Sequence, residues 1–331
     1  MFILGLKNDI VIYSMSILIP KISEQIYAED TLQILEDKYS TLGPIWVSHQ
    51  MEWHNAVYSA FKDHDKFLII IFLIKKTLDF YSRHFIKLSF DEFYSKDTIE
   101  IERFSVSEIS DSLLIPKESA RRKILELEKM GAIKKIKKKI IIDRSKFFYT
   151  KPNESIKRIS RFMSSFSEMC VIGNVLKKAI TSSNLEIIIK DNFSYIWKIY
   201  YEIQIPMMMS YKLVFKDLEI FHIFGTCIVN QHLHARKITN EHISRESFIK
   251  ILYESNNMQG LNAMSISDIT GIPRATVIRK LKNLVNLKYL VIDNKKHYKL
   301  GSNFVEQLKP LQKNIIFKIS KFSATIYNLA Q

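Results

Sequence analysis

The chain has little of the residues that break up or cross-link a fold. Its 331 residues include eight glycines, seven prolines and two cysteines. Few glycines and prolines argue against long flexible linkers, and abundant Ile, Leu, Lys and Glu predict mostly helix. Cys170 and Cys227 are far apart and lack metal-ligand spacing, so we exclude a disulfide framework and expect a reducing cytosol. A buried apolar position is the commoner one for such thiols.

Long apolar runs are also scarce. The run at residues 67–74 has eight residues, well short of the ~20 that a membrane-spanning helix needs. It is better explained as part of a central helix of the fold. The apolar residues 1–6 meet Lys7 and Asp9 too soon for a signal sequence. We therefore expect a cytoplasmic protein that makes no membrane contact.

Signatures of catalysis are missing from the sequence. It contains no Gly-rich phosphate loop, no Gly-x-Ser-x-Gly, no His-Glu-x-x-His and no paired cysteines. The nine histidines are scattered. His232 and His234 are two residues apart, so on a helix they point to different faces and cannot share a metal. His222 lies in an apolar segment, where we expect a packed core residue. We predict a non-enzyme without cofactor or metal site.

Positive charge, by contrast, is in excess and is concentrated in two places. The net charge at pH 7 is +15. Residues 117–146 contain 12 Lys or Arg and 4 Asp or Glu, and residues 274–300 contain 8 and 1, which gives net charges of +8 and +7. The rest of the chain is therefore neutral on balance. Two basic segments on a neutral body are typical of a nucleic-acid-binding protein, whereas a generally basic surface would spread its charge.

Each basic segment begins with a version of one short sequence. The two versions are Ile115-Pro116-Lys117-Glu118-Ser119-Ala120-Arg121-Arg122-Lys123 and Ile272-Pro273-Arg274-Ala275-Thr276-Val277-Ile278-Arg279-Lys280. A proline suits the first position of a helix, where its missing N–H would be unpaired anyway. Apolar residues then recur at i, i+4 and i+7, which predicts one buried helix face. They are Ala120, Ile124, Leu127, Val277, Leu281 and Leu284.

The segments around the two predicted helices also correspond. A short helix is predicted to start at Ser105 and another at Ser265, and the turn after the second is three residues shorter. A β-hairpin with a basic tip follows each copy. Helix, turn, helix and hairpin in this order resemble a winged helix-turn-helix, most of all that of the bacterial MarR-like transcription regulators. The resemblance covers this unit in each copy.

The resemblance implies a mostly α-helical fold with small β-hairpin wings, and it assigns roles to the outward residues. In this class the second helix approaches base edges, while the wing contacts phosphates or the minor groove. Arg can form two hydrogen bonds to guanine, and a Thr methyl can contact thymine. The candidates for base reading are Lys117, Glu118, Ser119, Arg121, Arg122, Arg274, Ala275, Thr276, Ile278 and Arg279. The candidates at the wing tips are Lys137, Lys138, Lys139, Lys295 and Lys296.

The correspondence extends beyond the basic segments. Phe61-Lys62-Asp63 recurs as Phe215-Lys216-Asp217, and Asp37-Lys38-Tyr39-Ser40 as Asp191-Asn192-Phe193-Ser194, both at an offset of 154. We predict an internal tandem duplication with a lead-in segment at 1–27, a first lobe at 28–172 and a second lobe at 173–331. The recognition helices are expected at about 116–130 and 273–287, and the wings at about 133–143 and 289–300. Because MarR-like regulators are homodimers, the resemblance implies that the two lobes and their flanking long helices form a pseudo-dimer, monomeric or weakly dimerising.

A stretch rich in aromatic residues and methionine, residues 193–211, has two interpretations. The favoured one is a hydrophobic seam that joins the lobes. The other is a pocket for a small-molecule effector, since ligand sites are apolar with a few polar groups. The residues concerned are Tyr195, Trp197, Tyr200, Tyr201, Met207, Met208, Met209 and Tyr211.

The two copies differ on the predicted reading surface, because Arg121 corresponds to Ile278 and Glu118 to Ala275. We therefore expect a nucleoid-associated, sequence-specific regulator of transcription that reads two unlike half-sites of double-stranded DNA, about one helical turn (~10 bp) apart. Two alternatives stay open. A plasmid-type replication initiator with tandem winged-helix domains would bind direct repeats. A tandem winged-helix chromosome-organising scaffold would bind protein, and its recognition faces need not be basic.

Overall fold

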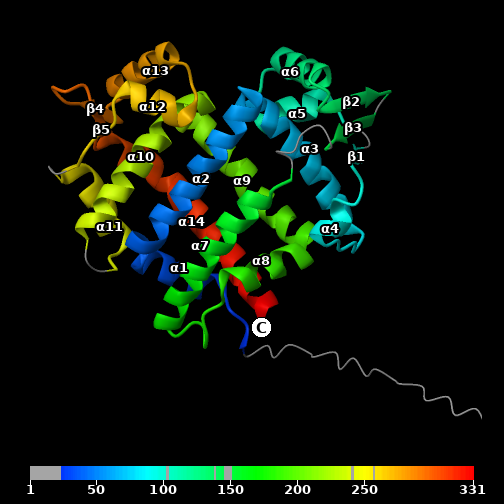
Figure 1. The fold of residues 1–331 in the computed structure, drawn as a ribbon, viewed down its shortest axis with the longest axis horizontal. Helices are drawn as coiled ribbons and strands as arrows, with labels where there is room; N and C mark the ends of the chain where they lie inside the picture. The colour runs from blue at the N-terminus through cyan, green and yellow to red at the C-terminus, as the bar shows by residue number, and fades with distance from the viewer. Residues whose placement is uncertain (1–23, 102–103, 138, 145–150, 240–241, 256–257) are drawn as a thin grey trace, which may run out of the picture.

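The computed structural model describes residues 24–101, 104–137, 139–144, 151–239, 242–255 and 258–331. Over these residues the chain is mostly helical with two small antiparallel sheets, as predicted (Figure 1). Residues 1–23 of the expected lead-in segment and Lys138 of the first wing lie outside the described residues.

The chain forms two halves, residues 24–172 and 173–331, that present similar elements in a similar order. The first half contains α1 (Ala28–Asp37), α2 (Tyr39–Phe61), α3 (His64–Arg83), α4 (Phe90–Phe93), β1 (Thr98–Ile101), α5 (Val106–Leu113), α6 (Lys117–Lys129), β2 (Ile133–Ile136), β3 (Lys139–Asp143) and α7 (Asn153–Ile172). The second contains α8 (Ser182–Asp191), α9 (Phe193–Phe215), α10 (Leu218–Ile238), α11 (Arg245–Glu254), α12 (Ala263–Thr270), α13 (Arg274–Asn286), β4 (Leu290–Ile292), β5 (Tyr298–Leu300) and α14 (Asn303–Ala330). Helices α1, α2, α5 and α6 have the same lengths as α8, α9, α12 and α13.

The repeated Phe-Lys-Asp sequence forms the same joint in each half. Helix α2 ends because Lys62 adopts a left-handed conformation, and Lys216 does the same after α9. Asp63 then caps α3 by accepting a hydrogen bond from the Asp65 amide, and Asp217 caps α10 by accepting one from the Ile220 amide. Such caps satisfy an otherwise unpaired N–H of the first turn. The run at residues 67–74 lies in α3 and is buried at seven of its eight positions.

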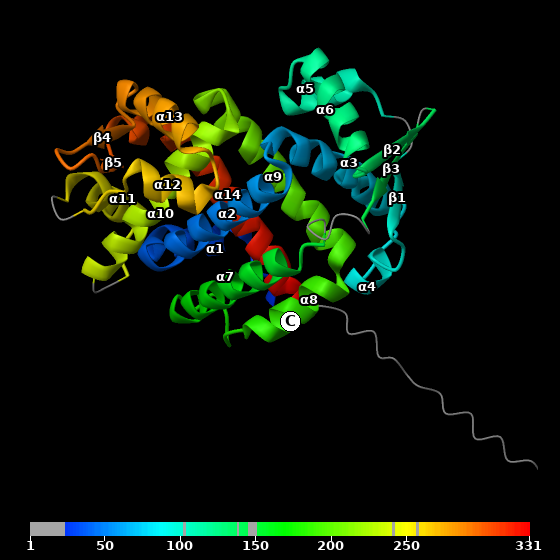
Figure 2. The same ribbon diagram turned by 45° about the horizontal axis from the view of Figure 1, so that its top comes forward.

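The two halves interlock through contacts that repeat with the halves exchanged. Helix α2 packs on α10 and α9 packs on α3, while α1 packs on α14 and α8 packs on α7. Figures 1 and 2 show α2, α9 and α14 in the middle of the molecule, with α10 on one side of them and α3 on the other. At the centre, the buried side chains of Gln50 and Gln204, 154 residues apart, form a hydrogen bond of 2.8 Å with each other. The helix contacts between the halves therefore come in corresponding pairs.

The two sheets differ in size. In the first half the strand order is β1-β3-β2, with Ile99 opposite Ile142 and Ile133 opposite the same residue on the other side. In the second half, β4 and β5 pair alone, and an isolated bridge between Leu261 and Tyr298 stands where β1 would add a strand.

The expected start of the second short helix was wrong. Asn262 caps α12 and the helix begins at Ala263, not at Ser265. Asn262 accepts a hydrogen bond from the Ser265 amide, as Ser105 does from the Glu108 amide at the start of α5. The turns that follow, residues 114–116 and 271–273, therefore have equal lengths. Asparagine and serine cap equally well, so aligning serine with serine misplaced the second helix by one turn.

Both thiols are buried and unbridged. Burial raises the pKa of Cys170 and of Cys227 to about 12, which keeps both protonated at neutral pH. Of the helices in the described ranges, none has the length and apolar character that crossing a membrane requires.

Candidate nucleic-acid interface

Two basic helix-and-hairpin units lie on one side of the molecule. We call α5, α6, β2 and β3 the first unit, and α12, α13, β4 and β5 the second unit. Helices α6 and α13 lie along the same edge in Figures 1 and 2, and the two hairpins lie at its outer ends. The two segments of high positive charge are therefore presented together, although about 150 residues separate them in sequence.

The two units are built in the same way. Pro116 and Pro273 are the N-cap residues of α6 and α13, one position before the predicted place. The hydroxyl of Ser110 donates to the Ile115 carbonyl at 2.6 Å, and that of Ser267 donates to the Ile272 carbonyl at 2.7 Å, which ties each preceding helix to the turn. The six apolar residues of the predicted buried faces, Ala120, Ile124, Leu127, Val277, Leu281 and Leu284, are buried.

Burial of one face leaves the candidate base-reading residues at the surface. Ser119, Thr276 and Ile278 are half-buried, and the other seven are exposed: Lys117, Glu118, Arg121, Arg122, Arg274, Ala275 and Arg279. The chain therefore brings all ten together in two clusters, one on each exposed helix.

The hairpin tips carry the candidate phosphate contacts. Lys137, Lys139, Lys295 and Lys296 are exposed, and Lys139 forms an ion pair with Glu100 of β1. In the second hairpin the Asp293 carboxylate accepts hydrogen bonds from the amides of His297 and Lys295, each at 2.9 Å. The bond from His297 is the main reason that the pKa of Asp293 is lowered. The loop is thus fixed by its own carboxylate, while the two lysine side chains extend outward.

The exposed arginines of α6 lie beside acids, whereas those of α13 do not. Arg122 lies 3.7 Å from Glu126, and Arg121 lies 3.6 Å from Glu118. Glu126 is also 2.7 Å from Lys66, whose hydrogen bond lowers the pKa of that carboxyl. Among the described residues, Arg274 and Arg279 form no ion pair, and α13 itself contains no acidic residue.

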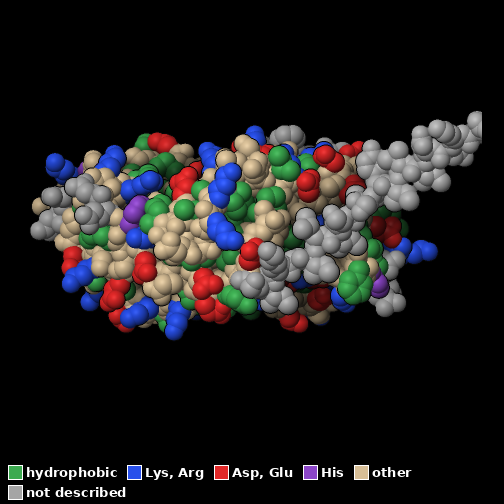
Figure 3. Space-filling view, turned by 90° about the horizontal axis from the view of Figure 1, so that it is seen from below, with side chains coloured by type: hydrophobic (Ala, Val, Ile, Leu, Met, Phe, Trp, Pro, Cys, Tyr) green, Lys and Arg blue, Asp and Glu red, His purple; other side chains and the backbone are tan. Residues whose placement is uncertain are grey.

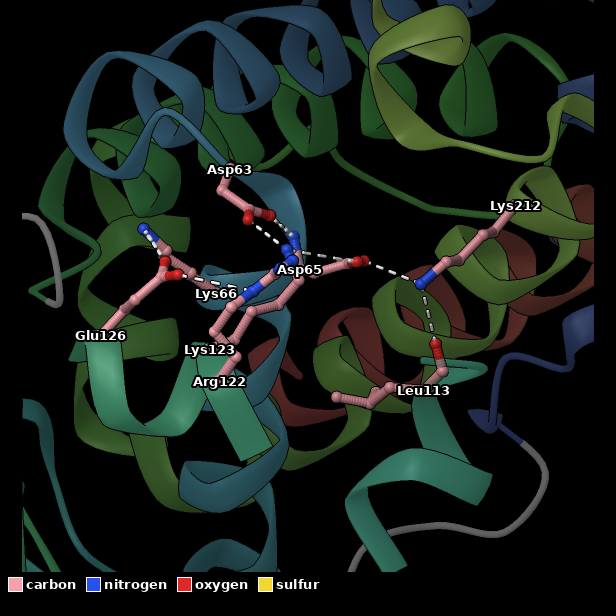
Figure 4. A network of polar contacts seen from close by, with 8 residues as sticks. All are labelled: Asp63, Asp65, Lys66, Leu113, Arg122, Lys123, Glu126 and Lys212. Carbon is pink, nitrogen blue, oxygen red and sulfur yellow. Dashed lines mark hydrogen bonds and ion pairs between the residues drawn. The ribbon is translucent and has the colours of Figure 1, made fainter. Parts of the chain in front are cut away.

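A lysine on the inner side anchors each of these helices to the core. Lys123 of α6 forms an ion pair with Asp63 and lies 3.8 Å from Asp65, which Lys212 of α9 holds at 2.8 Å (Figure 4). Lys280 of α13 lies 2.7 Å from Asp217 and 3.1 Å from Glu219. The lysine side chains are only 13% and 7% exposed, so they hold the helices in place and do not extend toward a ligand.

These anchors were not found in the sequence, although a signal existed. Lys123 corresponds to Lys280, and Asp63 corresponds to Asp217. No local spacing in the sequence connects either lysine with its aspartate. Two acids two residues apart at a helix start, repeated with a matching lysine on another helix, would have pointed to the pairing.

The opposite side of the molecule has a mixed character. Figure 3 shows it from below, with Asp and Glu side chains lying among Lys and Arg. The segments with net charges of +8 and +7, which contain α6 and α13, lie on the other side of the molecule.

The aromatic and methionine-rich stretch lies in α9, mainly in the core. Tyr195 is exposed, Tyr211 is half-buried, and the remaining six residues are buried. Met207 and Tyr211 line a cavity of about 90 Å³ between the halves, together with Trp46, Phe162 and Ile319. That volume is well under the ~300 Å³ of a typical small-molecule site. These residues thus pack as a seam, and an effector stays a prediction.

Comparisons with known proteins give no relative: no family model, curated protein or solved structure matches the chain.

Proposed function

We propose that the chain is a sequence-specific regulator of transcription that binds double-stranded DNA. The observation that carries this proposal is the presence of two exposed basic helices, each beside a basic hairpin, along one side of the molecule. Net charges of +8 and +7 in these segments supply the attraction to phosphate. Exposed Arg122 and Arg279 can supply contacts to bases.

We further propose that each unit is a MarR-like winged helix-turn-helix and that the lobes, 28–172 and 173–331, arose by duplication and form a pseudo-dimer. Equal lengths of the corresponding helices support the duplication. Reciprocal packing of α2 on α10 and of α9 on α3 supports the pseudo-dimer. One chain would then do what two subunits do in a homodimer, at an effective concentration set by the covalent link.

The proposed half-sites are unlike because the two reading surfaces are unlike. At the first unit Glu118 and Arg121 are exposed, whereas Ala275 and half-buried Ile278 occupy these positions at the second. A symmetric dimer reads a palindrome, so this chain should read an asymmetric site with half-sites about 10 bp apart on one face of the duplex.

The test is selection of bound sequences from a random or genomic pool of DNA by the full chain, followed by titration of the enriched site at several salt concentrations. We expect one asymmetric bipartite site. Arg122→Ala and Arg279→Ala should each relax a different half-site, at a cost of about 1–3 kcal/mol for the correct base. Lys178→Ala, an exposed lysine between α7 and α8, is the matched control and should change neither half.

Other outcomes of the selection would replace the proposal. A clean inverted repeat, or a separated lobe that binds as tightly as the whole chain, would contradict the pseudo-dimer. Repeated direct sites would favour the replication initiator. Binding that is only sequence-independent and steeply salt-dependent would favour the scaffold.

A further inference from the structure

Three histidines that are distant in sequence meet in the seam between the halves. His54 comes from α2, His64 from the first turn of α3, and His222 from the start of α10. Their ring centroids lie 5.0, 5.2 and 5.4 Å apart, and one nitrogen of each ring lies within 4.8 Å of the other two. His54 and His222 are fully buried, and His64 is 4% exposed. Nothing in their sequence spacing predicts this grouping.

Most ring nitrogens of this cluster lack a hydrogen-bond partner. Among the described residues, nothing pairs with either nitrogen of His54, either of His64 or Nδ1 of His222, and all five are buried. Nε2 of His222 lies 2.7 Å from Oδ1 of Asn55. Because an amide oxygen only accepts, Nε2 carries the proton and Nδ1 has a free lone pair. Leaving so many buried polar atoms unpaired costs free energy, and native proteins rarely do so without a reason.

We propose that His54, His64 and His222 bind a divalent transition-metal ion, Zn²⁺ or a similar imidazole-preferring ion such as Co²⁺ or Ni²⁺. Neutral imidazoles in an all-nitrogen set suit these metals and disfavour Mg²⁺ and Ca²⁺, which prefer oxygen. A tetrahedral ion with Zn–N bonds of ~2.0–2.1 Å needs ligand atoms about 3.3 Å apart, so the separations between the ring nitrogens shorten by at most about 1.5 Å when the ion binds. Water completes the coordination.

The surroundings suit such an ion. Burial lowers the pKa of all three rings, to about 3 for His64, so they are neutral and able to donate lone pairs at pH 7. Asn55 orients His222 as an outer hydrogen-bond acceptor usually orients a metal-binding histidine. The nearby ammonium of Lys280 is already paired with Asp217 and Glu219, so these groups together carry a net negative charge.

The proposed metal site lies close in the chain to the acids that anchor both basic units. His64 follows Asp63, which holds α6, and His222 lies one turn after Asp217 and Glu219, which hold α13. A metal would join the starts of α3 and α10 and so fix the relative placement of the two reading helices. On the proposed function, on which this step rests, preorganisation of this kind raises the affinity for the DNA site.

The first experiment measures metal binding by the untagged full chain without DNA. Chelator-stripped protein is titrated with Co²⁺, followed by its visible absorption, and Zn²⁺ affinity is found by competition. We expect one ion per chain, the intense absorption of tetrahedral Co²⁺, and a rise in unfolding temperature of about 5 °C with Zn²⁺. Absence of stoichiometric binding would overturn the proposal and leave three packed core histidines.

Variants locate the site. His54→Gln and His222→Gln should each weaken metal binding at least about 100-fold, and Asn55→Ala should weaken it about 10- to 100-fold. His232→Gln, at another buried histidine of α10, is the control and should bind as the wild type does. Unchanged affinity in the His54 or His222 variant would overturn the assignment. Should either variant fail to fold, by circular dichroism, the Asn55 variant and the wild-type Co²⁺ spectrum decide.

A separate titration with DNA tests the coupling. Zn²⁺ should raise the wild-type affinity for the selected site at least about fivefold and leave that of His222→Gln unchanged. Equal affinities with and without Zn²⁺ would refute the coupling but not the metal site, which the first experiment tests alone. Failure to select any DNA site would likewise refute the proposed function and leave the metal result intact.

Discussion

The two basic units share a framework and differ on the surface that it presents. Each has a capping proline, a serine that ties the turn, and a buried lysine paired with acids at the start of a core helix. Yet α6 carries five Lys or Arg and three Glu, whereas α13 carries four Lys or Arg and no acid. The difference separates residues that hold the helix in place from surface residues that vary between the units, even where the two kinds lie close in the chain, as Lys123 and Arg121 do.

The largest expected effect comes from removing an anchor. Lys280→Met leaves Asp217 and Glu219 without a cation, and should lower the free energy of unfolding by about 2–3 kcal/mol, less than a fully buried pair because the acids are partly exposed. Lys123→Met should cost about 1 kcal/mol less, because Asp65 keeps Lys212. Urea denaturation measures both. The control is Lys282→Met, at an exposed position of α13. If Lys280→Met and Lys123→Met lowered the free energy of unfolding equally, the two anchors would not differ in strength.

Acid should act on a buried histidine in each half. Burial lowers the pKa of His49 to about 3 and that of His232 to about 4, against 6.5 when unfolded. Below pH 6.5 the unfolded chain therefore binds more protons, and stability falls with pH until each folded pKa is reached, by up to about 1.4 kcal/mol per pH unit for each histidine.

Urea denaturation between pH 7 and pH 4.5 measures this loss. His49→Gln and His232→Gln should each flatten the dependence by about that amount. Identical slopes in the wild type and in both variants would show that these histidines stay neutral in the unfolded chain or are charged in the fold. The half-buried His234, replaced by Gln in the same way, serves as control.

Sequence reasoning worked where structure is set by nearby residues. Apolar spacing placed the buried faces of α6 and α13, and the lysine runs placed both hairpin tips, because helix and hairpin periodicity are local properties. It placed the start of α12 one turn too late, because Asn262 caps this helix whereas a serine caps α5. The mostly helical composition followed from the scarcity of glycine and proline.

What depends on packing between distant segments could not be predicted. His54, His64 and His222 come from three helices, and nothing in their spacing brings them together. The lysine and aspartate anchors are 60 and 63 residues apart. The histidine cluster depends on the packing of α2 on α10 between the halves, whereas each anchor joins two helices of one half. A site assembled across an interface leaves no local pattern in the chain.

Exchanging one residue between α6 and α13 tests whether an acid beside the arginine weakens the proposed DNA binding of the first unit. Position 126 of α6 corresponds to Asn283 of α13. On the proposed function, Glu126→Asn frees Arg122 and should raise DNA affinity about three- to fivefold, with a salt dependence steeper by at most ~0.9 in log–log slope. Asn283→Glu should lower the affinity to a similar extent by pairing with Arg279. Titration of the selected site at several salt concentrations measures both affinities. If both exchanges changed the DNA affinity in the same direction, pairing with acid would not explain the difference between the units.

The smallest effect concerns the turn before α6 and the turn before α13. Leu114 and Gly271 occupy the same place with left-handed backbones, at φ of 51° and 69°, and only glycine adopts this conformation without strain. Since Leu114 is 41% exposed, Leu114→Gly should stabilise the chain by about 0.5–1 kcal/mol. Gly271→Ala should destabilise it by about 1 kcal/mol, because a Cβ there would touch nothing within 4 Å and only the backbone strain remains. Leu114→Ala keeps the strain and should show no gain in thermal unfolding. If Leu114→Ala raised the unfolding temperature as much as Leu114→Gly does, the strain before α6 would come from the leucine side chain and not from the left-handed backbone.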